Sequence, residues 1–143
     1  MGCRFIPIAV LSVALGGCAA GLPSPFSIPR GAPTEVRKSI SMFYCDAQWR
    51  AHGCVRIQQL DLGGTDCSAS IPWLIALLKD DTYAWSPSIF YPHTGTPVWH
   101  EAKTALYCIG DPALPALDKA IASSDPKLSK RAKLVSDKIR APD

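Results

Sequence analysis

The sequence predicts an all-α fold for residues 34–143, and three observations support this prediction. Apolar residues recur at helical spacing in three consecutive segments of the C-terminal half, near 97–109, 112–123 and 127–140. The junction Gly110-Asp111-Pro112 ends one helix and begins another, because glycine favours a helix C-terminus and proline a first turn. Similar apolar patterns lie upstream, so we expect about five to six helices in one domain.

Each expected helix presents one apolar stripe. The first two are expected at about 34–44 and 46–60, and a third at about 68–79. The clearest stripe belongs to the helix expected at 97–109 and consists of Val98, Ala102, Ala105, Leu106 and Ile109. The next two helices, at 112–123 and 127–140, have stripes of the same kind, and Ser123-Ser124-Asp125-Pro126 separates them.

Two of these helices recur as a pattern. Residues 71–78 align with residues 114–121, and a short acidic turn follows each of them. The stripe of 98–109 likewise aligns with that of 128–139. Helices of two kinds therefore alternate along the chain, as they do in repeat proteins.

The segment Ile109-Gly110-Asp111-Pro112-Ala113-Leu114-Pro115-Ala116-Leu117, with Ile71-Pro72-Trp73-Leu74 as its partner, resembles the HEAT-like repeat family, including the short type of the phycobilisome lyases. The resemblance covers about 46–140. It implies a short right-handed α-solenoid, in which neighbouring helical hairpins bury one another's apolar stripes. Residues that lyases use on chromophores have no identifiable counterpart, so no lyase activity is implied. A non-repeating helical bundle is the alternative fold.

The N-terminus has the pattern of a secretory signal. A short basic start is followed by an apolar run over 5–15, too short to span a bilayer. The run ends in Leu15-Gly16-Gly17-Cys18, which resembles the lipobox of bacterial lipoproteins. The resemblance implies that residues 1–17 are removed and that Cys18 carries the lipid. An ordinary cleaved signal peptide is the alternative.

A lipid on Cys18 would place the protein in the bacterial cell envelope, anchored in a bilayer by two or three acyl chains. Residue 19 is Ala rather than Asp, which in a Gram-negative source implies the outer membrane, with the domain facing the periplasm. Residues 18–33 contain four prolines, so we expect an extended tether that holds the domain a few nanometres from the lipid.

The charge of the chain excludes a general affinity for nucleic acid. The 15 basic residues exceed the 12 acidic residues only slightly, giving a formal net charge of +3. The basic residues gather in 127–140, where they form either a solvated helix face or a contact surface for anionic lipid or an acidic partner.

Four cysteines follow Cys18, namely Cys45, Cys54, Cys67 and Cys108. Their even number suggests disulfides in an oxidising compartment, and their spacing matches no zinc motif. In a HEAT-like stack, the turns that contain Cys67 and Cys108 would be neighbours, so the resemblance implies a Cys67–Cys108 disulfide. Buried free thiols are the alternative.

The segment 82–97 is a long insert between two expected helices, and it is rich in aromatic residues. It supplies four candidate protein-binding residues, Tyr83, Trp85, Phe90 and Tyr91. Trp99, two residues after the segment, is the fifth candidate. Aromatic side chains on loops often anchor a partner, because they bury much area at little entropic cost. The same insert could instead fold back and cap the core.

No catalytic centre, metal site or cofactor other than the covalent lipid is expected. His93, His100 and Glu101 suggest a metal, but neighbouring residues on a helix point about 100° apart. A nucleophile pair of Cys108 and His100 lacks an oxyanion-hole motif. The sequence thus favours a lipid-anchored scaffold that binds an envelope protein. The alternative is a small enzyme or ligand carrier built on the loop 82–97.

Overall fold

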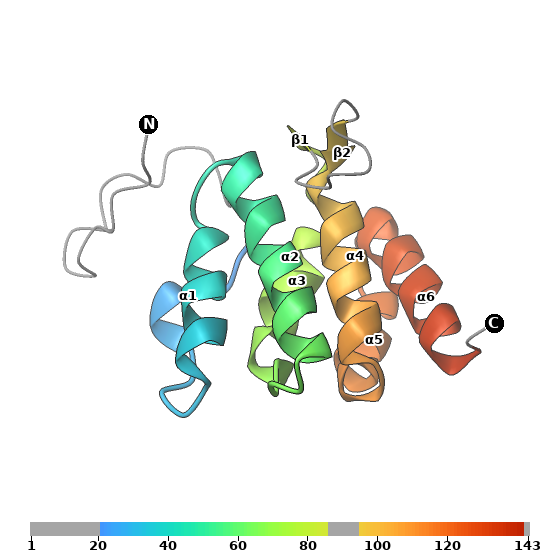
Figure 1. The fold of residues 1–143 in the computed structure, drawn as a ribbon. Coiled ribbons are helices and arrows are strands. Elements are labelled where there is room, and N and C mark those ends of the chain that lie inside the picture. Colours follow the sequence, from blue (N-terminus) through green and yellow to red (C-terminus); the bar gives the residue numbers. More distant parts are fainter. Residues whose placement is uncertain (1–20, 86–94, 142–143) are drawn as a thin grey trace.

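The computed structural model describes residues 21–85 and 95–141. Within these ranges the α-helices are α1 (Thr34–Met42), α2 (Ala47–Leu62), α3 (Ile71–Leu77), α4 (Val98–Ile109), α5 (Leu114–Ile121) and α6 (Pro126–Arg140) (Figure 1). One-turn 3-10 helices are η2 (Pro25–Ser27), η3 (Ser68–Ser70) and η4 (Asp111–Ala113). The all-α fold class is therefore confirmed, and each helix begins and ends within a few residues of its expected bounds.

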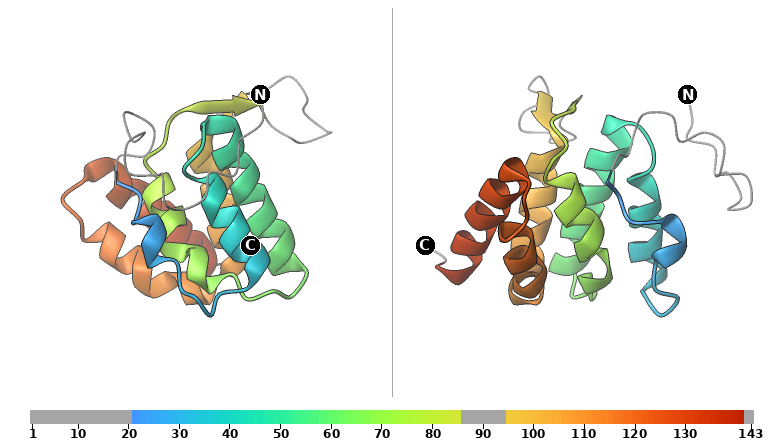
Figure 2. Two further views of the ribbon diagram at one scale, coloured as in Figure 1. Left: turned by 90° about the vertical axis from the view of Figure 1, so that its left-hand side faces the viewer. Right: turned by 180° about the vertical axis from the view of Figure 1, so that it is seen from behind.

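The helices pack in pairs and in rows. The helices α1 and α2, α3 and α4, and α5 and α6 form three successive antiparallel pairs. The helix α4 also packs between α2 and α6, while α3 packs on α5 (Figures 1 and 2). The helices α2, α4 and α6 therefore lie in one row, with α3 and α5 side by side next to it.

Local signals set the helix ends. Asp46 caps α2 by accepting a hydrogen bond from the backbone N–H of Trp49 at 3.1 Å. Asp125 caps α6 in the same way, and Pro126 occupies its first turn. Gly110 ends α4 with a φ of +69°, a conformation that glycine adopts without strain.

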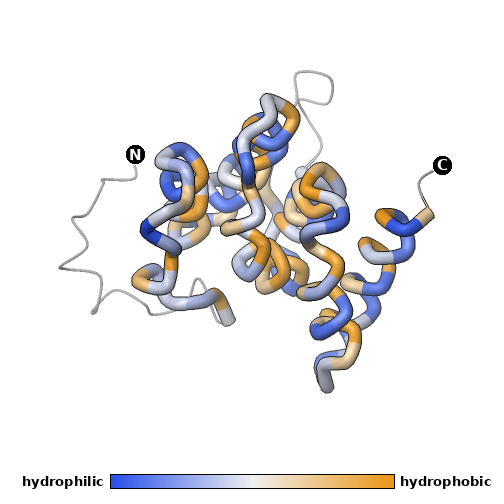
Figure 3. The backbone as a smooth tube through the Cα atoms, turned by 90° about the horizontal axis from the view of Figure 1, so that it is seen from below, coloured by the Kyte–Doolittle hydropathy of each residue, from blue (hydrophilic) through white to orange (hydrophobic). Residues whose placement is uncertain are grey.

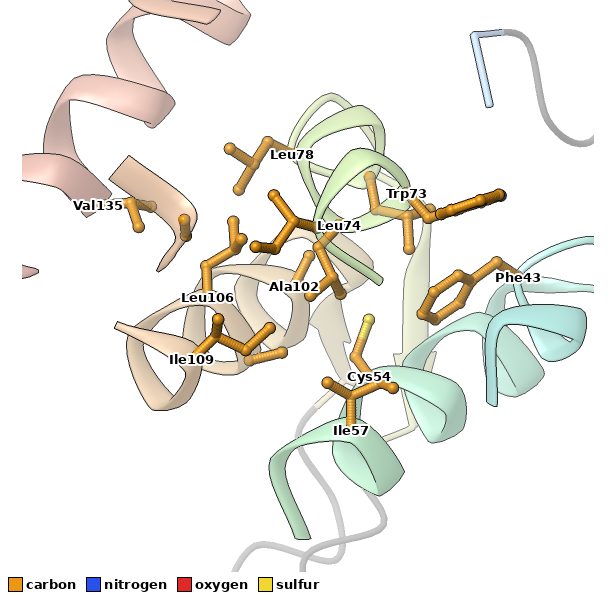
Figure 4. Packing of buried hydrophobic residues seen from close by; sticks show 14 of the residues in the cluster. Phe43, Cys54, Ile57, Trp73, Leu74, Leu78, Ala102, Leu106, Ile109 and Val135 are labelled. Atoms are coloured by element: carbon orange, nitrogen blue, oxygen red, sulfur yellow. The ribbon is translucent and has the colours of Figure 1, made fainter. Parts of the chain in front are cut away.

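The core lies between the rows, where the apolar stripes meet. Figure 3 shows apolar and polar residues alternating along the helices, as amphipathic packing requires. Leu74 of α3 meets Ala102 and Leu106 of α4, and all three are fully buried (Figure 4). All five stripe residues expected in α4 are buried, which confirms the face predicted for this helix.

The close approach of α1 and α2 depends on Gly53. A Cβ at this position would lie 2.8 Å from Cε1 of Phe43 and 2.9 Å from the carbonyl oxygen of Ser39. Both distances are shorter than normal carbon contacts, so only glycine allows the two helices to pack this closely.

The ends of the insert 82–97 form a hairpin that the sequence analysis did not predict. Strands β1 (Tyr83–Trp85) and β2 (Gly95–Pro97) are antiparallel, with Ala84 opposite Thr96. The backbone N–H of Val98 donates to the carbonyl of Thr82 at 3.0 Å and closes the base of the hairpin. The two ends of the insert therefore lie side by side, between the end of α3 and the start of α4.

The described part of 18–33, which we expected to be an extended tether, contacts the helical domain. Leu22 and Ile28 pack against the core, and Pro23 accepts a hydrogen bond from the hydroxyl of Tyr44. Burial of the two apolar side chains holds the segment against the helices, although its prolines exclude a regular long helix.

Candidate protein-binding site

The strand β1 presents two large aromatic side chains to solvent. Tyr83 and Trp85 are 71% and 66% exposed, whereas Ala84 between them is buried. Successive side chains of a strand point to opposite faces, so Ala84 rests on the helices while its neighbours face outward. Neither aromatic ring covers the core, which excludes the capping role for these two residues.

A glutamine of α2 fixes the backbone of β1. The side-chain amide of Gln48 donates from Nε2 to the carbonyl oxygen of Trp85 at 3.0 Å. Its Oε1 accepts from the backbone N–H of the same residue at 2.9 Å. One side chain thus satisfies both backbone groups of Trp85, as a neighbouring strand would. Trp85 is held in place by its backbone, and its ring remains available.

A nearly buried ion pair supports the base of the hairpin. Nε of Arg50 donates to Oδ2 of Asp80 at 2.7 Å, and Nη1 donates to the carbonyl of Cys45, also at 2.7 Å. Oδ1 of Asp80 accepts from the backbone N–H of Thr82 at 2.9 Å. The carbonyl of Asp80 accepts from Trp99 at 3.0 Å. Asp80 therefore joins α2, the first residues of the hairpin and the start of α4.

Trp99 has a different environment from Tyr83 and Trp85. The guanidinium carbon of Arg131 lies 4.2 Å from the centre of the Trp99 ring, within the range of a cation–π contact. Arg131 also donates to the carbonyl of Leu78 at 2.7 Å and to Asp81 at 2.6 Å. Trp99 thus helps to join α4 to α6 and is only partly exposed, unlike Tyr83 and Trp85. Phe90 and Tyr91, the other two candidates, lie outside the described residues.

Many cations of α6 have a carboxylate partner within the described residues. Lys127 and Arg131 both contact Asp81, Lys133 contacts Asp137, and Arg140 contacts Asp118. Hydrogen bonds from Lys127 and Arg131 lower the pKa of the Asp81 carboxyl. These contacts make much of the basic segment 127–140 a set of surface ion pairs.

The predicted Cys67–Cys108 disulfide is wrong in this structure, because both residues are free thiols, as is Cys54. Cys67 is buried, and its Sγ donates to the carbonyl of Ile57 at 3.7 Å. Burial raises the pKa of Cys67 to about 11 and also raises the pKa values of Cys54 and Cys108. Cys54 and Cys67 act as small apolar residues of the core, whereas Cys108 is partly exposed. Cys45 is disulfide-bonded.

The residues considered for chemistry do not converge. The ring of His100 lies edge-on to Trp99, with the centroids 4.2 Å apart, and burial lowers its pKa. The Glu101 carboxylate instead accepts from Gln58 at 3.3 Å. Cys108 is protonated at neutral pH and so is a weak nucleophile. In the part of the chain that the structure describes, no three His, Cys, Asp or Glu residues could hold a metal. His93 lies outside this part.

Sequence reasoning missed the residues that position the hairpin, namely Gln48, Arg50 and Asp80. No local pattern marks Gln48 or Arg50, because each acts on a segment that lies far away in the chain, and the partner of the Asp80 carboxylate in the ion pair is 30 residues away. Comparison of the chain with protein-family models, curated proteins and solved structures found no match. Across residues 21–85 and 95–141, no helix is long and apolar enough to cross a membrane.

Proposed function

We propose that this protein is a bacterial lipoprotein anchored through an acylated Cys18, and that its helical domain is a scaffold that binds an envelope protein. The N-terminal pattern supports the anchor, since a short basic start and an apolar run precede Leu15-Gly16-Gly17-Cys18. In a Gram-negative source, the domain would face the periplasm from the outer membrane.

The packing of the helices supports a HEAT-like solenoid. Three antiparallel pairs follow one another, and α4 packs against both α2 and α6. Successive pairs therefore pack on one another along the chain, as in repeat proteins. We infer that the six helices form three HEAT-like hairpins of a short solenoid.

The exposed face of β1 is the observation that carries the binding proposal. Tyr83 and Trp85 are largely solvent-exposed, yet the backbone of Trp85 is fixed by two hydrogen bonds from Gln48. A rigid aromatic side chain loses little conformational entropy when a partner covers it. Exposed aromatic residues on an ordered backbone are therefore good anchors for a protein partner.

A photo-crosslink at position 85 tests this proposal. Trp85 is replaced by benzoylphenylalanine in the full-length protein in its own host, and adducts are identified by mass spectrometry. Leu62, which is 79% exposed at the end of α2, is replaced in a matched control. We expect one discrete protein adduct from position 85 and none of that identity from position 62.

Binding by the identified partner is then measured with purified proteins. We expect Trp85→Ala and Tyr83→Ala each to weaken the complex by at least tenfold, because each removes a large side chain that the partner would bury. Leu62→Ala should leave the affinity unchanged. Equal affinities of all three variants, or the same adducts from positions 85 and 62, would contradict the proposed binding site.

The anchor is tested by the mass of the N-terminal peptide of the mature protein. We expect the peptide to begin at Cys18 and to carry a thioether-linked diacylglyceryl group. Because a thioether leaves no thiol, a lipidated Cys18 could form no disulfide. A Cys18 found in a disulfide would disprove the anchor.

A further inference from the structure

The segment that precedes α1 is fastened to the domain by two consecutive hydrogen bonds. Nε1 of Trp73, a residue only 2% exposed, donates to the hydroxyl oxygen of Tyr44 at 2.7 Å. The same hydroxyl donates its proton to the carbonyl oxygen of Pro23. Leu22 and Ile28 pack against the core on either side of this point. The chain from Leu22 onward is therefore part of the folded domain and does not act as a spacer.

The described chain begins beside the base of the hairpin. A Cβ built on Gly21 would lie 3.5 Å from Nζ of Lys79, which lies between the end of α3 and the start of β1. Cys18 is only three residues before Gly21. Three residues span at most about 11 Å when fully extended. A lipid on Cys18 would therefore enter the bilayer close to Lys79.

We infer that the edge of the domain around Lys79 faces the bilayer and lies against its headgroups. The inference rests on the proposed lipid anchor at Cys18 and concerns the orientation of the anchored domain. It replaces the standoff of a few nanometres that an extended tether over 18–33 would give.

The exposed side chains at this edge include two lysine–aspartate pairs. Lys79 lies 3.6 Å from Asp125, and Lys127 contacts Asp81, so each ammonium group is already held near the surface. The Lys79 and Lys127 side chains remain 38% and 50% exposed. Ammonium groups in this setting can donate to lipid phosphates while keeping their carboxylate partners.

This orientation also restricts the partner of the hairpin. Tyr83 lies four residues after Lys79, so the exposed face of β1 would act close to the membrane surface. The partner that contacts Tyr83 and Trp85 would then be a protein embedded in, or bound to, the same membrane. A protein that remains far from the bilayer could not reach this face.

Quenching by headgroup-labelled lipids tests the orientation. The full-length lipidated protein is reconstituted in phosphatidylethanolamine and phosphatidylglycerol vesicles that contain a nitroxide-headgroup lipid. A bimane label is placed on Lys79→Cys or, as the matched control, on Asp111→Cys. Both variants also carry Cys108→Ser, because the partly exposed Cys108 thiol would also take the label. Cys54 and Cys67 are buried and need no substitution.

The two label positions lie at opposite ends of α4. The carbonyl of Asp80, next to Lys79, bonds to the N–H of Trp99 at the start of this helix, and Asp111 follows its end. Twelve helical residues span about 18 Å. We expect bimane at position 79 to be quenched several-fold more than bimane at position 111. A long Gly/Ser insert between Ala20 and Gly21 should remove this difference.

The outcomes separate the inference from the proposed anchor. If the protein fails to bind vesicles and its N-terminal peptide lacks lipid, the anchor at Cys18 is disproved. If the lipidated protein binds vesicles but both positions are equally quenched, or position 111 is quenched more, the proposed orientation is wrong while the anchor stands. Quenching at position 79 that persists with the Gly/Ser insert would show that the short connection between Cys18 and Gly21 does not set the orientation.

Discussion

Arg50 and Asp80 form an ion pair that is almost closed to solvent, with side chains 5% and 16% exposed and a distance of 2.7 Å from Nε to Oδ2. Removal of one partner leaves the other charge buried and uncompensated, which costs more than the pair itself contributes. We predict that Asp80→Ala lowers the free energy of unfolding by about 3 kcal/mol. Chemical denaturation monitored by circular dichroism measures this change. Lys133→Ala, which breaks the exposed Lys133–Asp137 pair, should change it by less than about 0.5 kcal/mol.

The hydrogen bonds from Gln48 to Trp85 predict a local effect. We expect Gln48→Ala to increase the hydrogen-exchange rate of the Trp85 amide and to lower the free energy of unfolding by about 1–2 kcal/mol, because two modest bonds are lost. Partner binding through Trp85 should weaken as well, although the aromatic side chain is unchanged. Gln59→Ala, an exposed position on the same helix, is the control. Unchanged exchange at Trp85 would show that Gln48 does not fix the strand.

Steric contact at Gly53 predicts the effect of one added carbon. Gly53→Ala would place a Cβ within 3 Å of Phe43 and Ser39 and force α1 away from α2. We expect a loss of about 1–3 kcal/mol, typical of overpacking, even though alanine favours helices. Gly31→Ala, where no atom lies within 4 Å, should be close to neutral in the same thermal unfolding experiment. A stabilised Gly53→Ala variant would disprove the close packing.

Buried thiols predict the pattern of alkylation. At pH 8, Cys54 and Cys67 of the native protein should resist iodoacetamide, since burial shields them and raises their pKa values. Cys108, which is partly exposed, should react slowly, and its rate should rise as the pH increases. Peptide mass spectrometry gives the modified fraction at each cysteine, and denatured protein provides the fully reactive reference. Rapid modification of Cys67 in the native state would contradict its burial.

The pKa of His100 predicts a pH dependence of stability. Burial and Lys103 lower this pKa in the folded state, so the unfolded state binds the proton more strongly. The contribution of His100 to stability is therefore complete above its unfolded pKa of about 6.5 and decreases as the pH falls through that value. His100→Gln should flatten the curve of unfolding free energy between pH 7.5 and 5.5, and an unchanged slope would disprove this contribution.

Helix positions were predictable because their signals are local. The stripe from Val98 to Ile109 and the junction at Gly110 depend on residues within one or two turns. The hairpin was missed because its strands are three residues long and one of them contains Gly95 and Pro97, which are poor strand formers. What holds it in place is the bond between Gln48 and Trp85, 37 residues apart, which no local pattern encodes.

The tether and the disulfide show a related limit. The prolines of 18–33 correctly exclude a long helix, but they do not reveal that Leu22 and Ile28 bury against the core. An even number of cysteines suggests bridges, yet Cys67 serves as a core residue between helices. Both outcomes depend on tertiary contacts. The sequence identified the aromatic candidates, and the structure separates the exposed Tyr83 and Trp85 from Trp99, whose ring Arg131 contacts.

The base of the hairpin would allow the exposed strand residues to vary without a change in the helices. Thr82 and Val98 are joined by a backbone hydrogen bond, and the carbonyl of Asp80 bonds to Trp99 beside them. These two hydrogen bonds fix the distance between the end of α3 and the start of α4, and the strands themselves do not set it. Substitutions of the exposed residues Tyr83 and Trp85 should therefore leave the stacking of the helices unaffected, whereas Ala84 is buried against them. Homologues could acquire new partners by changing this one segment, while the helical scaffold is inherited unchanged.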